Sequence, residues 1–168
     1  MRVLIVGKGG REHAIAWKIS KSPLLDKLFC INPNPGMQSL CSPSNAEDIP
    51  KFCKENGINL VIIGPENPIA EGLANRLLDS DIKVFAPTAE AAKLEASKVF
   101  AKRLMERHNI PTANFEVFED SQKAKRFVKD FGAPIVIKAD GLASGKGVFV
   151  CQDINQALEA INLLMSKD

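Results

Sequence analysis

Short apolar runs alternate with segments of helical periodicity in the first half of the chain. Runs rich in Val, Ile and Leu predict strands at residues 2–6, 28–31, 59–63 and 83–86. The segments between them predict helices at residues 11–21, 49–56 and 69–80. The face of the first helix expected to be buried carries Ala14, Ile15, Trp17 and Ile19. This alternation predicts an α/β fold with a doubly wound parallel sheet covered on both faces.

After Pro87 the pattern changes to helical segments followed by a small mixed unit. Thr88 and Ser97 are suitable N-caps for helices that run to residues 95 and 108, and Asn109 suits a left-handed helix end. The pattern then predicts a strand at residues 114–118, a helix at 120–131, a glycine-rich hairpin and a helix at 155–165. We therefore expect an α/β domain at residues 1–87, a helical linker at 88–113 and a small α+β subdomain at 114–168.

Composition limits the classes of partner. Of the 168 residues, 45% are hydrophobic and 25% are charged, which is enough apolar material for one large or two small cores. A formal net charge of +2, no Tyr and one Trp predict neither a nucleic-acid surface nor an anionic-membrane surface. No apolar run approaches the roughly 20 residues of a membrane span, and the opening residues lack the pattern of a secretory signal.

The cysteines and histidines show no metal-binding or disulfide pattern. The four cysteines are Cys30, Cys41, Cys53 and Cys151, and none belongs to a C-x-x-C pair. They fit reduced thiols in a cytoplasmic protein better than a disulfide framework. Cys30 and Cys151 lie in apolar runs and are expected in the core. His13 and His108 have no partner at metal-ligand spacing, so we predict no protein metal site in this chain.

The segment from Ile135 to Val148, IVIKADGLASGKGV, carries the strongest signal for phosphate binding. Its glycines free the backbone to bring N–H groups close to an anion, and Lys138 stands where a buried strand ends. A P-loop would need four residues before the Gly-Lys pair, then Ser or Thr and a helix. Here Gly141 and Gly145 enclose three residues, and a strand-like run follows. The spacing favours a hairpin that covers a bound nucleotide. The alternative is an ordinary glycine-rich hairpin whose lysines are solvated.

The first strand-to-helix turn, residues 7–13, is a second candidate for anion binding. In a doubly wound fold this turn presents helix N-terminal amides, and Arg11 adds a guanidinium. A dinucleotide fingerprint would require glycine where Glu12 stands, and an acid where Asn32 ends the second strand. The turn therefore suits a phosphate on a small metabolite better than NAD, and a tight turn with a surface arginine is the alternative.

Five motifs resemble one enzyme family. They are GKGGREHA at 7–14, IIGPENPIAEG at 62–72, APTAEAAKLEASKVFAK at 86–102, IPTA at 110–113 and IVIKADGLASGKGV at 135–148. In sequence and in order, these motifs resemble those of the phosphoribosylamine–glycine ligases, which are also called glycinamide ribonucleotide synthetases. The last motif alone would indicate only the wider ATP-grasp superfamily.

The resemblance implies an ATP-dependent ligase of purine biosynthesis. ATP, with Mg²⁺ or Mn²⁺, would phosphorylate glycine, and the amine of phosphoribosylamine would then attack the glycyl phosphate to give glycinamide ribonucleotide, ADP and phosphate. It also implies that residues 1–87 form a phosphoribosylamine-binding pre-ATP-grasp domain, that the ATP-grasp domain begins within 88–113, and that 114–168 form its lid. The metal ligands are expected C-terminal to this chain.

The resemblance also assigns candidate site residues. Those implied for phosphoribosylamine are Gly9, Gly10, Arg11, Glu12, Pro65 and Glu66. Those implied for ATP are Lys98, Lys138, Gly141, Ser144, Gly145, Lys146 and Gly147. No catalytic residue is assigned, and His13 is expected to be structural because no motif supplies an orienting carboxylate.

Two departures from the family pattern matter. Residues 32–36, NPNPG, replace the usual PGNAG, and the shortened stretch to Glu47 predicts the loss of a strand. Family chains are also much longer, so the resemblance implies that this chain alone does not complete the reaction and needs the C-terminal portion of the enzyme. The alternatives are a truncated nucleotide- or phosphosugar-binding protein, a subunit of a split enzyme, or a different ATP-grasp ligase or carboxylase.

Overall fold

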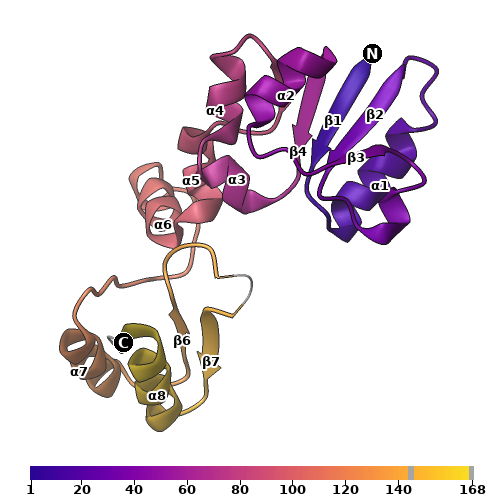
Figure 1. Cartoon of the computed structure of the whole chain (residues 1–168). Coiled ribbons are helices and arrows are strands. Elements are labelled where there is room, and N and C mark those ends of the chain that lie inside the picture. Colours follow the sequence, from indigo (N-terminus) through magenta and orange to yellow (C-terminus); the bar gives the residue numbers. More distant parts are fainter. Residues whose placement is uncertain (144–145, 167–168) are drawn as a thin grey trace. The chain divides into compact units, whose positions relative to one another are not determined.

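The computed structural model describes residues 1–143 and 146–166. The chain forms two compact units, Met1–Lys93 and Leu94–Asp168 (Figure 1). None of the helices in the described residues combines the length and the apolar character needed to cross a bilayer. Each unit has its own core.

The first unit is built on a five-stranded parallel sheet. Its strands are β1 (Arg2–Val6), β2 (Lys27–Ile31), β3 (Ser42–Ser44), β4 (Leu60–Ile63) and β5 (Lys83–Phe85). They lie in the order β3-β2-β1-β4-β5, and every neighbouring pair is parallel. The α/β fold class predicted from the sequence is thus confirmed.

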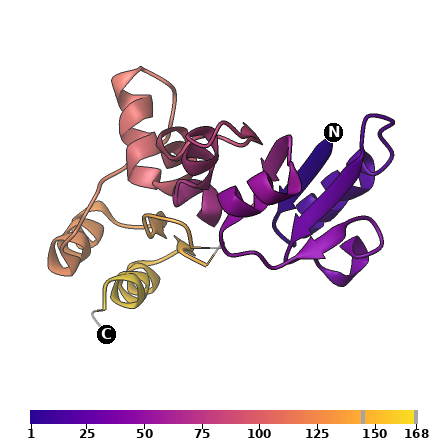
Figure 2. The ribbon, with the colours of Figure 1, turned by 45° about the horizontal axis from the view of Figure 1, so that its top comes forward.

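Helices cover both faces of this sheet (Figure 1, Figure 2). They are α1 (Gly10–Ile19), the 3₁₀ helix η1 (Pro35–Met37), α2 (Ile49–Asn56), α3 (Glu66–Ala70), α4 (Leu73–Leu78) and α5 (Ala89–Ala96), which leads into the second unit. Val3 and Ile5 of β1 face α1 and η1, whereas Leu4 and Val6 face the core made with α2, α3 and α4. Because successive residues of the central strands point into two buried cores, β1 is apolar from Val3 onward and β4 is apolar over its whole length.

Three local predictions in this unit are wrong. The shortened stretch keeps a strand, β3, which pairs with β2 at the sheet edge. The helix expected at 69–80 is two helices, because Gly72 adopts a left-handed conformation with φ of 80° between them. Trp17 is 52% exposed and lies under the ammonium of Lys21, which is 3.4 Å from the ring centroid.

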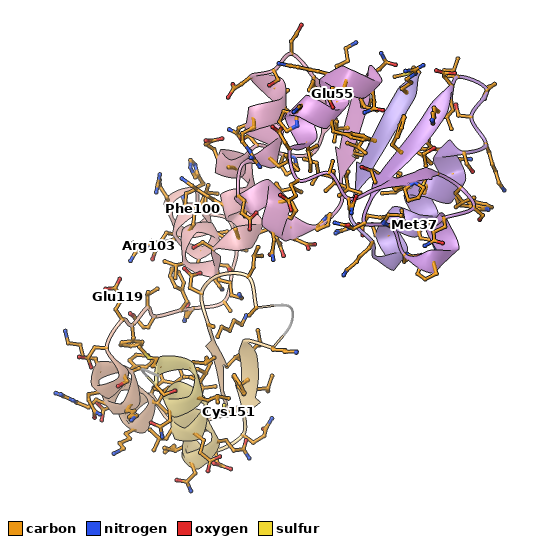
Figure 3. All side chains as sticks on the ribbon, in the orientation of Figure 1. Met37, Glu55, Phe100, Arg103, Glu119 and Cys151 are labelled. Carbon is orange, nitrogen blue, oxygen red and sulfur yellow. The ribbon has the colours of Figure 1, made fainter. Side chains whose placement is uncertain are left out.

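The second unit combines a hairpin with helices. Its elements are α6 (Lys98–Arg107), α7 (Ser121–Phe131), β6 (Ile135–Lys138), β7 (Val148–Cys151) and α8 (Ile154–Met165). The two strands pair antiparallel, and α8 packs across the hairpin and against α7. The core includes Val128, Ile161 and Cys151, the last residue of β7 (Figure 3). Cys30, at 0% exposure, and Cys151, at 2%, confirm their predicted burial.

The predicted strand at residues 114–118 is not a strand in the structure. The ladder of β6 and β7 in the described residues includes no third strand that could pair with this segment. The two residues just before this segment are held near α6, because Lys102 Nζ donates to Thr112 Oγ1 at 2.7 Å and to the Ala113 carbonyl at 2.8 Å. Both ends of α6 match the prediction. At its start, the Ser97 hydroxyl accepts from the Phe100 amide at 3.0 Å, and beyond its end, Asn109 has φ of 54°.

Candidate functional site

The strand order of the first unit brings two candidate segments together. Strands β2 and β3 lie on one side of β1, and β4 and β5 lie on the other, so the chain reverses its direction of winding between β1 and β4. Ligands of open α/β sheets bind at the carboxyl ends of the strands that flank such a reversal. The turn after β1 and the first turn of α1 hold Gly9, Gly10, Arg11 and Glu12, and the turn after β4 and the start of α3 hold Pro65 and Glu66.

Glycines allow these two turns to approach closely. Gly7 has φ of 121°, and a Cβ there would lie 2.7 Å from both Cδ and Cγ of Pro65. A Cβ on Gly64 would overlap the carboxyl group of Glu12. The absence of side chains at Gly7 and Gly64 therefore creates the space that the Glu12 side chain fills. The site prediction did not include these two glycines, although the glycine-rich turn itself was a signal for them.

Glu12 is the buried centre of the first candidate site. Its side chain is 3% exposed, and its two carboxylate oxygens have different protein partners. Oε2 accepts from the Gly9 amide at 2.7 Å, and Oε1 accepts from Arg11 Nε at 2.8 Å. The first of these contacts is the reciprocal half of a capping box, in which an acid in the first helical turn binds the N-cap amide. Glu12 therefore fixes both the start of α1 and the arginine beside it.

Arg11 connects the buried carboxylate to an exposed one. Its Nη1 lies 3.1 Å from Glu66 Oε1, and the two side chains are 53% and 51% exposed. The hydrogen bond to Glu12, and next the one to Glu66, raises the pKa of Arg11 above its ordinary value. The Glu66 backbone amide, and next the Arg11 guanidinium, lowers the pKa of the Glu66 carboxyl. A fixed cation and a fixed anion thus share the solvent-facing side of the turn.

Glu66 is expected to titrate below the ordinary glutamate pKa of 4.5. Its ion pair with Arg11 is complete at pH values above the unfolded-state pKa and is lost as the pH falls through the lower folded-state value. The ¹³Cδ chemical shift of Glu66, followed against pH, measures this directly. Arg11→Ala should raise the pKa only part of the way back, since the backbone amide is the larger cause; a full return would contradict that assignment.

The NPNPG loop after β2 packs against the same turn. Asn34 Nδ2 donates to the Lys8 carbonyl at 2.9 Å, and Asn34 Oδ1 accepts from the Met37 amide at 3.2 Å. A Cβ on Gly36 would lie 2.5 Å from Cε1 of His13, so the His13 ring packs on the loop backbone. The unusual loop therefore supports the first turn through Asn34, a residue that the site prediction omitted.

The second candidate site lies around the glycine loop of the hairpin. Lys98 Nζ donates to the Gly141 carbonyl at 2.8 Å, which joins two predicted ATP residues from distant parts of the sequence. Lys138 is exposed at the end of β6, opposite Val148, and Lys146 is also exposed. The Gly147 carbonyl accepts from the Ala139 amide at 2.8 Å, which closes the base of the loop. Ser144 and Gly145, also predicted to bind ATP, lie outside the described residues.

The hairpin face on the side of Lys138 is apolar and exposed. Val136, Val148 and Val150 are 47%, 43% and 67% exposed. The pairing of Val136 with Val150 and of Lys138 with Val148 puts all four side chains on one face, because alternate residues of a strand share a face. An apolar surface that ends in a lysine can accept a flat base at one end and phosphates at the other.

Two further residues join the glycine loop to α6, and the site prediction included neither. The Ser97 hydroxyl lies 3.0 Å from Asp140 Oδ2 and 3.2 Å from Oδ1, and the Val99 amide donates to Oδ1 at 3.2 Å. Slight desolvation opposes ionisation of the exposed Asp140, but the hydrogen bonds led by the one from the Val99 amide bring its pKa below the ordinary value. The position of Asp140 directly before Gly141 was the available signal.

The described residues contain no cluster of three or more side chains of the kind that bind metal ions. Across residues 1–143 and 146–166, no group of three His, Cys, Asp or Glu side chains could hold an ion together. The carboxylate nearest the glycine loop, Asp140, already accepts hydrogen bonds from α6.

The two units have the fold of ATP-grasp proteins. N5-carboxyaminoimidazole ribonucleotide synthetase from Thermus thermophilus aligns with 96% of this chain and 44% of its own, with a TM-score of 0.67 at 21% identity. The model of the phosphoribosylglycinamide synthetase N domain matches residues 1–95, and that of the ATP-grasp (A) domain of the same synthetase matches residues 96–168. The chain therefore belongs to the phosphoribosylglycinamide synthetase family, which confirms the resemblance drawn from the five motifs.

Individual relatives agree with this assignment. The phosphoribosylamine–glycine ligase of Rhizobium meliloti is 46% identical over 167 residues, which cover 96% of this chain and 40% of the relative. That of Caldanaerobacter subterraneus is 44% identical and is covered to 41%. The crystal structure of the Thermotoga maritima ligase superposes with a TM-score of 0.77 at 32% identity, over 99% of this chain and 41% of that one. The chain thus spans about 40% of the length of these relatives.

Proposed function

We propose that this chain supplies the phosphoribosylamine-binding domain and the first part of the ATP-grasp domain of a phosphoribosylamine–glycine ligase. The reaction joins glycine to phosphoribosylamine, with ATP converted to ADP and phosphate. The observation that carries the proposal is the Glu12–Arg11–Glu66 arrangement at the winding reversal of the sheet, in a member of this family. Its polar groups suit a small phosphorylated sugar that carries an amine.

In this proposal the first unit binds and orients the nucleophile. The Arg11 guanidinium and the amides at the start of α1 bind the phosphate, because both present positive charge to the same turn. Glu12 acts through Arg11 and the Gly9 amide, since its own carboxylate is buried. Pro65 and Glu66 border the sugar from the neighbouring turn, and the Glu66 carboxylate accepts from its polar hydrogens.

The second unit contributes positive charge for the nucleotide. A carboxylate reacts poorly with an amine, so glycine must first be phosphorylated, and the amine then displaces phosphate from the acyl phosphate. Lys98, Lys138 and Lys146, with amides of the loop from Gly141 to Gly147, would hold the triphosphate during that transfer. ATP brings Mg²⁺ or Mn²⁺ when it binds, and we place the ligands of that ion outside the described residues.

The chain spans about 40% of the length of these relatives. The alternative proposal is a subunit of a split enzyme, or a phosphosugar- or nucleotide-binding protein without catalysis. Glycine-dependent ADP formation, measured for the chain alone and with the remaining part of a relative added, separates the catalytic roles from the non-catalytic one. Activity only in the mixture supports a part of the ligase, whether or not the enzyme is split, and no activity in the mixture supports a binding protein without catalysis. We also propose a cytoplasmic setting, where the four free thiols stay reduced.

Ribose 5-phosphate, a stable compound with the same sugar and phosphate, is expected to shift the amide resonances of Gly9, Gly10 and Arg11. Arg11→Ala should weaken its binding by about tenfold, because a charge-assisted contact to phosphate is lost. An NMR titration measures both effects. The matched control is Arg76→Ala, which removes an exposed arginine of α4 in the same unit. Equal affinities for the two variants would contradict a phosphate site at Arg11.

A further inference from the structure

Hydrogen bonds connect the root of the glycine loop with the first turn of α6. Asp140 and Gly141 form the loop root, and Ser97, Lys98 and Val99 form the start of the helix. Asp140 accepts from the Ser97 hydroxyl at 3.0 Å and from the Val99 amide at 3.2 Å. The contact joins parts of the chain that are 41 to 43 residues apart, so local sequence does not enforce it.

The same hydrogen bonds determine the position of a lysine side chain. Lys98 follows Ser97 directly, and its ammonium donates to the Gly141 carbonyl at 2.8 Å. An ammonium has three N–H donors, so one contact to a carbonyl leaves two for anionic oxygens. Gly141 itself has φ of 87°, which turns the chain out of β6 and into the loop. Lys98 and the first residue of the loop therefore share one fixed geometry.

These hydrogen bonds also explain how a carboxylate can lie beside an anion-binding loop. An ionised Asp next to a triphosphate would repel it unless its charge were directed elsewhere. Both oxygens of Asp140 accept from groups at the start of α6, where the helix dipole favours negative charge. These donors also lower the pKa of the exposed Asp140 in spite of slight desolvation, so the carboxylate stays ionised at neutral pH.

We propose that Asp140 is a positioning residue for nucleoside triphosphate binding: through Ser97 and Val99 it holds the glycine-loop root against α6 and directs the Lys98 ammonium toward the loop. It does not contact the nucleotide. Its effect is preorganisation, because a loop and a lysine that are already in place lose less conformational freedom on binding. The inference rests on the proposed nucleotide site and adds a residue that acts behind it.

ATP is the probe, and the amide resonances of Gly141, Leu142 and Lys146 in the whole chain are the readout. The dissociation constant for ATP should rise about tenfold in Asp140→Ala, which loses an ionic hydrogen-bond acceptor. Ser97→Ala should cause a smaller rise, and Asp140→Asn should be intermediate because its amide oxygen can still accept from Val99. If Ser97 acts through Asp140, the double variant should bind ATP as weakly as Asp140→Ala alone.

The control is Asp153→Asn, which changes the capping aspartate of α8 in the same unit and retains an acceptor for the Gln156 amide. Its ATP affinity should equal that of the original chain. A merely structural role for Asp140 would lower thermal stability without changing the dissociation constant below the melting temperature, and that result would overturn the inference. If Asp140→Ala does not fold, Asp140→Asn and Ser97→Ala decide by the same criterion. Loop amides that do not respond to millimolar ATP even when the remaining part of a relative is added to the original chain would refute the nucleotide site itself.

Discussion

Gly7→Ala is expected to destabilise the first unit by about 2 to 4 kcal/mol. Alanine at φ of 121° has a strained backbone, and its Cβ would lie 2.7 Å from Pro65 and 2.9 Å from Cγ of Glu12. Both neighbours are ring or stem atoms with little room to move. Urea unfolding followed through Trp17, the single tryptophan, reports on this unit because α1 carries the residue.

Gly10→Ala is the matched control within the same motif. A Cβ on Gly10 meets nothing within 4 Å, and the residue begins α1 with no positive φ. Alanine has the higher helix propensity, so this variant should be unchanged or more stable by up to about 1 kcal/mol. Equal loss of stability in the two variants would mean that the motif tolerates no added methyl group anywhere. The specific fit of Gly7 against Pro65 would then be the wrong explanation.

The central strands could be predicted because burial on both faces makes them apolar without interruption. β1 and β4 are of this kind, and the sequence placed both within one residue. β3 could not be found in the same way. Its sequence is Ser-Pro-Ser, and it is a strand only because the edge of β2 is available for pairing, for example between the Asn32 amide and the Ser44 carbonyl at 2.7 Å. An edge strand can hold Pro43 because one side of its ladder is free.

The segment at residues 114–118 shows the opposite error. Its alternation of polar and apolar residues fits a strand, but alternation alone does not supply a partner. Phe118 packs with the core of the second unit and lies 5.2 Å from the ring centroid of Phe127. An apolar residue of the segment thus packs in a core as it would in a strand, but the backbone hydrogen bonds of a strand require a neighbouring strand.

The candidate sites were predictable as segments, but their internal contacts were not. Motif spacing identified the turn at residues 9–12 and the loop after β6. It could not show that Glu12 is buried, because the space for Glu12 is made by glycines from two separate turns. Nor could it show that Asp140 binds the start of α6, since that contact depends on the tertiary path of residues 100–139. Pairs that are distant in sequence become visible only when the chain is folded.

Glu12→Gln is expected to destabilise the first unit by about 1 to 3 kcal/mol and to weaken its binding of ribose 5-phosphate. The carboxylate accepts from two donors, the Gly9 amide and Arg11 Nε. Glutamine has the same shape, but its NH₂ group must face one of those donors. One buried hydrogen bond is therefore replaced by two N–H donors that face each other. If the amide faces Arg11, the guanidinium loses the acceptor that orients it toward the ligand.

Urea unfolding and a ribose 5-phosphate titration measure the two effects separately, with Glu71→Gln as the control for an exposed glutamate in the same unit. A structural role alone predicts lower stability with unchanged affinity in the folded protein. A role in positioning Arg11 predicts that the loss of affinity persists where the variant is fully folded, and that Arg11→Ala adds little further loss to Glu12→Gln. Additive losses in the double variant would show that the two residues act independently, against the geometry in which Arg11 Nε lies 2.8 Å from the carboxylate.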